Sequence, residues 1–62
     1  MSLEPQLSSV STALTELTSR IAELGESLSG DQRDDLASAL FEIERSLATA
    51  GRRLDQLVSD LR

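Results

Sequence analysis

The sequence predicts an all-α fold: an antiparallel two-helix hairpin of the coiled-coil type that dimerises into a four-helix bundle. Three observations lead to this prediction. Apolar residues recur with a 3.5-residue period along two segments, one turn-forming cluster separates them, and 62 residues without cysteine leave oligomerisation or exceptionally regular helix packing as the source of stability. We expect residues 1–62 to form a single helical hairpin, with helices at about 3–28 and 32–61 and a turn at 29–32.

The first helix is predicted from apolar residues that alternate at steps of four and three positions. They are Leu3, Leu7, Val10, Leu14, Leu17, Ile21, Leu24 and Leu28. A heptad with Leu7 at position a and Val10 at position d describes all eight, and this spacing is typical of a coiled coil. We expect Ser2 to cap this helix and Pro5 to lie in its first turn, where no backbone donor is needed.

The turn is predicted at Ser29-Gly30-Asp31-Gln32, the turn-like cluster in the interior of the chain. We expect Gly30 to adopt the positive φ that ends a helix. Either Ser29, with Gln32 as its capping-box partner, or Asp31 is expected to cap the second helix. So short a turn makes the two helices antiparallel neighbours.

The second helix repeats the apolar spacing of the first. Its residues are Leu36, Leu40, Ile43, Leu47, Ala50, Leu54, Leu57 and Leu61. If the turn centres on Gln32, facing residues have numbers that add to 64, so that Leu24 meets Leu40. Each a residue then meets a d residue of the other helix, which predicts an a/d seam along a rod of about 40–45 Å.

Positions e and b follow one side of this predicted seam and hold mostly small, uncharged residues. We predict that this stripe is an oligomer interface, because small residues let helices of two hairpins approach closely and form a four-helix bundle. The alternative is that the stripe merely reflects a composition rich in Ala and Ser. The predicted interface residues are Ala22, Gly25, Ala37, Phe41, Ala48, Gly51 and Val58.

Charge and hydropathy bear on the class of partner. Eleven acidic and six basic residues give a net charge of −5, which argues against binding to duplex nucleic acid. The longest apolar run, residues 39–41, is too short to span a membrane, and the N-terminus lacks the pattern of a signal peptide, so we expect a cytoplasmic protein. All basic residues are Arg, which we interpret as a GC-rich coding bias and hence as a sign of a bacterial source.

The residue types present argue against catalysis. The chain has no His, Cys or Tyr, which supply most nucleophiles, general bases and transition-metal ligands. Asp31, Asp34 and Asp35 lack the ligand pattern of a calcium loop and are expected to complement the helix dipole instead. We therefore expect no enzyme activity, no metal and no cofactor.

One polar pattern lies on a face of the second helix, where Arg52, Gln56 and Asp60 follow at steps of four. It resembles part of the motif E-x3-S-x2-R-x3-Q-x3-D of the cyclic-di-GMP-responsive anti-sigma factors, which are also antiparallel helical hairpins. Thr49 stands in the place of Ser, and Arg45 stands in the place of Glu. The resemblance implies an anion or nucleotide contact at the three matching residues, and since the first helix has no second copy, a two-copy site would need a homodimer. The alternatives are that the three matches arise by chance in a polar helix, and that Arg52 and Arg53 are helix-end charges that pair with Asp55 or Asp60.

Three functional hypotheses follow. The leading one is a non-enzymatic protein–protein interaction or regulatory module that acts as a homodimer and docks a further protein partner. The second is a structural oligomerisation element or assembly scaffold. The third is a cyclic-di-GMP-responsive regulator that resembles the anti-sigma factors and uses Arg52, Gln56 and Asp60.

Overall fold

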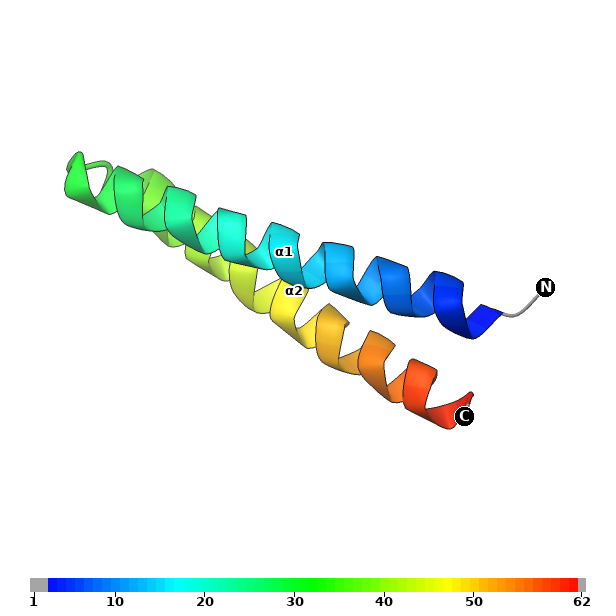
Figure 1. Cartoon of the computed structure of the whole chain (residues 1–62). Helices are drawn as coiled ribbons and strands as arrows, with labels where there is room; N and C mark the ends of the chain where they lie inside the picture. Colours follow the sequence, from blue (N-terminus) through cyan, green and yellow to red (C-terminus); the bar gives the residue numbers. More distant parts are fainter. Residues whose placement is uncertain (1–2, 62) are drawn as a thin grey trace.

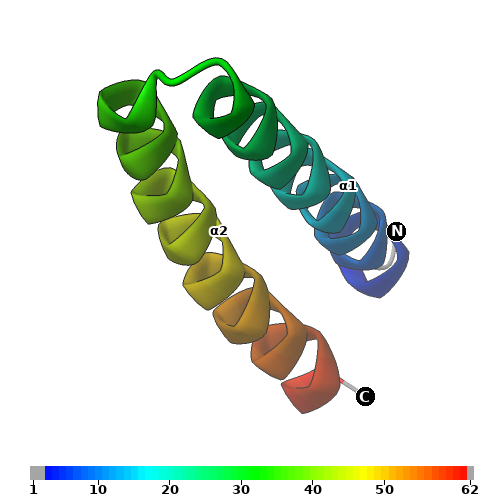
Figure 2. The same ribbon diagram turned by 90° about the vertical axis from the view of Figure 1, so that its left-hand side faces the viewer.

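The protein is a helical hairpin, as the sequence predicts. The computed structural model describes residues 3–61 and contains α1 (Leu3–Gly30) and α2 (Asp34–Asp60), which lie side by side (Figure 1). The hairpin is a rod of 48 × 14 × 11 Å, and the start of α1 and the end of α2 lie at the end opposite the turn (Figures 1 and 2). Neither helix is long and apolar enough to cross a membrane. The cap expected at Ser2 lies outside the described residues.

The turn comes later in the chain than expected. Residues 31–33 connect the helices, and Gln32 takes the left-handed conformation with a φ of 63°. Gly30, the residue expected to adopt a positive φ, stays in the last turn of α1 with a negative φ. The prediction for Gly30 is wrong because α1 continues two residues beyond the expected end of the helix, which moves the reversal to Gln32.

Two backbone hydrogen bonds close the end of α1. The N–H of Arg33 donates to the carbonyl of Leu28 at 2.9 Å, and the N–H of Gln32 donates to the carbonyl of Ser29 at 3.1 Å. This pair of bonds is the Schellman motif, in which the residue after the helix cap is left-handed. Glycine is the usual residue at that position because it has no Cβ, whereas here the position is occupied by Gln32.

The start of α2 also differs from the prediction. Its N-cap is Arg33, which makes no side-chain capping bond, so neither Ser29 nor Asp31 caps this helix. The hydroxyl of Ser29 instead donates to the carboxylate of Asp34 at 3.5 Å. Asp34 and Asp35 lie in the first turn of α2, where acidic residues are favourable at the positive end of the helix dipole.

The contact between the helices is centred on the e positions of the heptad. The buried residues Gly25, Ala37 and Val58 all occupy position e, and the a residues beside them are half-buried. The d residues, such as Leu17 and Ile43, are exposed. The predicted a/d seam is therefore wrong for position d, because both helices are rotated so that e lies between them.

The pairing of facing residues shows the same rotation. Gly25 faces Phe41, and Ser11 faces Asp55, so the numbers of facing residues add to 66 rather than 64. This pairing joins an e residue of one helix to a b residue of the other. The small side chains at these positions explain the arrangement, since they let the two backbones approach more closely than two rows of leucines would.

Candidate interaction surfaces

The predicted oligomer-interface stripe lies inside the hairpin. All seven of its residues are buried or half-buried between α1 and α2: Ala22, Gly25, Ala37, Phe41, Ala48, Gly51 and Val58. The stripe thus contributes to the contact between α1 and α2 within one chain. Its role as an oligomer interface stays a prediction.

Phe41 and Gly25 are the closest pair in this stripe. A Cβ atom placed on Gly25 would lie 2.8 Å from Cε1 of Phe41 and 3.1 Å from its Cδ1. No real Cβ approaches a carbon atom so closely, so the ring fits only because position 25 is glycine. The sequence indicated a close helix–helix approach at Gly25, and the structure supplies the partner from the same chain.

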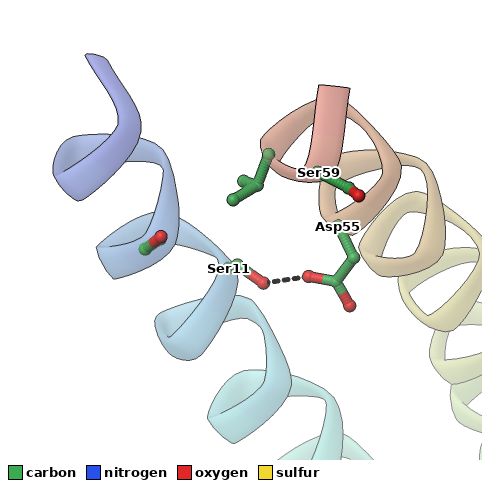
Figure 3. Close-up of a pocket in the computed structure, with 5 residues that line it drawn as sticks. Ser11, Asp55 and Ser59 are labelled. Atoms are coloured by element: carbon green, nitrogen blue, oxygen red, sulfur yellow. Dashed lines mark hydrogen bonds between the residues drawn. The ribbon is translucent and has the colours of Figure 1, made fainter. Parts of the chain in front are cut away.

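A polar contact joins the helices nearer the chain ends. The hydroxyl of Ser11 on α1 donates to Oδ1 of Asp55 on α2 at 2.5 Å, across the helix contact (Figure 3). These two residues and three neighbours line an open groove of about 280 Å³, the others being Ser8, Val58 and Ser59. Asp55 is the one ionisable group of this groove, so the groove holds no acid–base pair.

The remaining described residues offer no metal site either. Within residues 3–61, no group of three or more His, Cys, Asp or Glu side chains lies close enough together to hold a metal ion. A second groove of about 240 Å³ runs past Gly51, where the missing side chain leaves space beside Thr15 and Leu14. It is lined by apolar atoms, hydroxyl groups and the carboxylate of Asp55, which is its one ionisable group.

The polar residues that resemble the anti-sigma motif lie on an exposed face of α2. The amide of Gln56 donates to the carboxylate of Asp60 at 3.0 Å, and the guanidinium of Arg52 donates to the hydroxyl of Thr49 at 3.2 Å. The four residues therefore form two separate pairs along α2, and none of them lines either of the two grooves described above. Among the described residues, neither Arg52 nor Arg53 forms an ion pair with Asp55 or Asp60, so the pairing of helix-end charges that was the alternative is not seen.

Sequence reasoning missed a surface made of the exposed d residues. We call it the d face; it consists of Leu3, Val10, Leu17 and Leu24 of α1 with Leu36, Ile43, Ala50 and Leu57 of α2. Its seven large side chains are 42% to 62% exposed, which is unusual for a leucine-rich row. The signal for this surface was the heptad, which the sequence analysis assigned entirely to the contact within one chain.

Both rows of the d face lie on the same side of the hairpin. Around each helix the positions follow in the order d, a, e, b, and both helices touch at e. Two antiparallel helices that touch through equivalent positions are related by an approximate twofold axis perpendicular to the plane of the hairpin. Rotation about this axis keeps each face on its own side, so the d residues of both helices line one face.

The approximate symmetry also appears in the sequence numbering. Leu3 and Leu36 are 33 positions apart, as are Leu24 and Leu57.

Comparison with protein-family models, with curated proteins and with solved structures finds no match to this chain. The arrangement of its own residues is therefore the basis for a functional proposal.

Proposed function

We propose that the protein is a non-enzymatic protein–protein interaction module that acts as a homo-oligomer, with the dimer as its basic unit. The proposal rests on one observation: the chain has many apolar residues, but a single hairpin buries few of their side chains. Among the described residues, Ala37 and Val58 are the only buried hydrophobic side chains, and no large side chain is fully buried. Most of the leucines are thus half-buried or exposed in a single hairpin.

Energetics favour association over a stable lone hairpin. Complete burial of a Leu or Ile side chain contributes about 1.5–3 kcal/mol, and a chain that leaves its d face in water forgoes roughly half of this at each position. Small domains usually compensate for a small core with disulfides, a metal or a partner chain. The chain has no cysteine, its described part has no metal-binding cluster, and the packing of α1 on α2 buries few apolar side chains, so these observations favour a partner chain as the source of stability.

The chemistry of the surface supports a binding role over a catalytic one. Both grooves are open to solvent, and the described residues include no pair of titratable groups held apart from solvent. Catalysis by proton transfer or nucleophilic attack needs groups activated in a sheltered site. A helical surface that presents apolar rows is instead typical of helix–helix recognition.

Sedimentation equilibrium tests this proposal directly. The full chain should show a mass about twice that of the 6.7 kDa monomer, with a monomer–dimer equilibrium at low concentration. A monomer at every concentration up to the millimolar range would contradict the homo-oligomer. Open-ended growth of the mass with concentration would contradict a closed dimer and favour the structural assembly scaffold.

A further inference from the structure

We infer that the d face is the surface on which a second copy of this chain docks, and that two hairpins meet face to face in a four-helix bundle with a core of a and d residues. This inference rests on the proposed function and adds the surface and the arrangement. It differs from the e/b stripe predicted from sequence, whose residues are buried or half-buried in the contact between α1 and α2.

The helix rotation within the hairpin is the one that a four-helix bundle requires. In a two-stranded coiled coil both a and d residues face the single partner helix. In a four-helix bundle each helix touches two neighbours, and its a and d residues point to the common core. Here e meets the neighbour within the chain, a is half-buried beside it, and d is left for a helix of another chain.

The area of the d face suits a specific dimer. Its seven large side chains, together with Leu61, present on the order of 700 Å² of apolar surface in one patch, more than the largest patch of a typical monomer. Two copies in contact would bury about 1,400 Å², which lies within the range of specific, stable protein–protein interfaces.

The d face is complementary to itself in shape. Its two rows repeat with the same seven-residue spacing, as from Val10 to Leu17 in α1 and from Ile43 to Ala50 in α2. Residues on such rows interdigitate when two faces are related by a twofold axis, because each knob on one copy then meets a hole on the other. A second copy is therefore an occupant whose surface matches this face in both period and width.

The charges beside the d face permit two copies to meet. Position g flanks each d row, and its residues are exposed and mostly small or uncharged: Gln6, Ala13, Arg20, Ser27, Ala39, Ser46, Arg53 and Asp60. Of the acidic residues in the two helices, Asp60 alone lies at g, whereas the others, such as Glu16 and Glu23, lie at b, c, e or f, away from the face. Two chains of charge −5 thus meet without placing acidic rows against each other, whereas an anionic lipid surface would face few basic residues.

A charge placed in the d face tests the inference. The variant Leu17→Glu puts a carboxylate in the centre of the proposed core, and the matched control Ser9→Glu puts the same charge at an exposed c position of α1. We expect Leu17→Glu to raise the dimer dissociation constant by roughly a hundredfold or more, and Ser9→Glu to leave it within about threefold. Sedimentation equilibrium measures both.

A second pair of variants separates association from folding. Leu17→Ala removes apolar area but adds no charge, and alanine is at least as good a helix former as leucine. We expect it to raise the dissociation constant by about tenfold or more, with Ser9→Ala as the control that leaves it unchanged. A weakened dimer in Leu17→Ala therefore reports on the d face and not on loss of the helix.

The outcomes distinguish the two proposals. A wild-type dimer that survives both Leu17 variants would overturn the d face as the interface while leaving the homo-oligomeric module intact. A wild-type monomer would overturn both. Binding of a monomeric wild type to phosphatidylglycerol vesicles, lost in Leu17→Glu, would overturn the second copy as the occupant and assign the d face to a lipid surface.

Discussion

The ring of Phe41 lies so close to the backbone of Gly25 that a Cβ atom at position 25 would approach Cε1 of the ring to 2.8 Å. This contact joins the single aromatic residue of the chain to one of its three glycines. It marks a close approach of α1 and α2 near the turn. The rotation that brings these two residues together is also the rotation that leaves the d face exposed.

Replacement of Gly25 by alanine should destabilise the protein, although the same change elsewhere should stabilise it. Alanine is favoured over glycine inside a helix by about 1 kcal/mol. At Gly51 a Cβ atom would lie an ordinary 3.8 Å from Leu14, and at Gly30 it would meet nothing within 4 Å, so both substitutions should gain this amount. At Gly25 the clash with Phe41 should outweigh the gain, as urea denaturation followed by circular dichroism would measure.

A second substitution tests whether the ring of Phe41 is the group that clashes with a Cβ atom at position 25. In a Phe41→Ala background the ring is gone, so Gly25→Ala should there stabilise the protein by about 1 kcal/mol. If Gly25→Ala stabilises the wild type as much as Gly51→Ala does, the close approach of Phe41 to the backbone is wrong.

Replacement of Gln32 by glycine should stabilise the turn. A residue with a Cβ atom pays about 1–2 kcal/mol in the left-handed conformation, and glycine avoids this cost although it gains freedom in the unfolded chain. We expect a net gain of about 0.5–1 kcal/mol and a higher melting temperature. Gln32→Ala keeps the Cβ atom and should change little; a melting temperature that falls in Gln32→Gly would contradict the left-handed conformation.

The hydrogen bond between Ser11 and Asp55 should couple the two helices weakly. Hydrogen bonds in proteins contribute about 0.5–1.5 kcal/mol, and both partners here are accessible to solvent. A double-mutant cycle of Ser11→Ala and Asp55→Ala should give a coupling free energy of about 0.5–1 kcal/mol. Strictly additive effects of the two substitutions would show that the bond contributes nothing to stability.

The melting temperature should depend on protein concentration. Since a dimer is favoured by mass action and the unfolded chains are separate, a higher concentration raises the melting temperature. We expect a rise of several degrees over about a thousandfold range of wild-type concentration, followed by circular dichroism. Leu17→Glu should melt at a lower temperature than the wild type at every concentration, because its dimer is weaker. A melting temperature of the wild type that does not change with concentration would contradict dimerisation.

Cyclic-di-GMP should leave the melting temperature unchanged. Arg45 occupies the position where the resembling anti-sigma factors have an acidic residue, and Gln56 and Asp60 bond to each other in the free protein. A ligand that binds the folded state raises its melting temperature, so thermal denaturation with and without the dinucleotide is a direct test. A rise that is lost in Gln56→Ala would instead favour the nucleotide-responsive regulator.

The sequence was sufficient to predict the helices and their antiparallel order, because the 3.5-residue period and the turn-forming cluster act locally. It was not sufficient to predict which heptad positions meet within the chain. The same a/d pattern is used when two helices form a seam and when four helices share a core. Small residues at e, such as Gly25 and Ala37, were the sequence signal for the contact within the chain, since they permit a close approach of the two helices that leucines at d do not.

The turn shows a second limit of sequence reasoning. Gly30 is the residue with the greatest conformational freedom in the cluster, but a glycine that can adopt a positive φ can also keep a helical backbone. A helical glycine costs about 1 kcal/mol relative to alanine, and the backbone bonds of Gln32 and Arg33 complete the helix end two residues later. Whether the chain reverses at Gly30 or at Gln32 depends on the sum of several small free-energy contributions. The identity of one residue does not determine that sum.

The 33-residue repeat of the apolar pattern has a consequence for the role of the turn. Because α1 and α2 carry equivalent rows, the core of the proposed bundle would receive four nearly equivalent helices, whichever pairs are covalently joined. In that bundle residues 31–33 would act as a tether, which raises the effective concentration of one helix near the other without supplying core contacts. We therefore expect two separate peptides that span the two helices to retain the apolar contacts of the proposed bundle and to lose only the advantage of being linked.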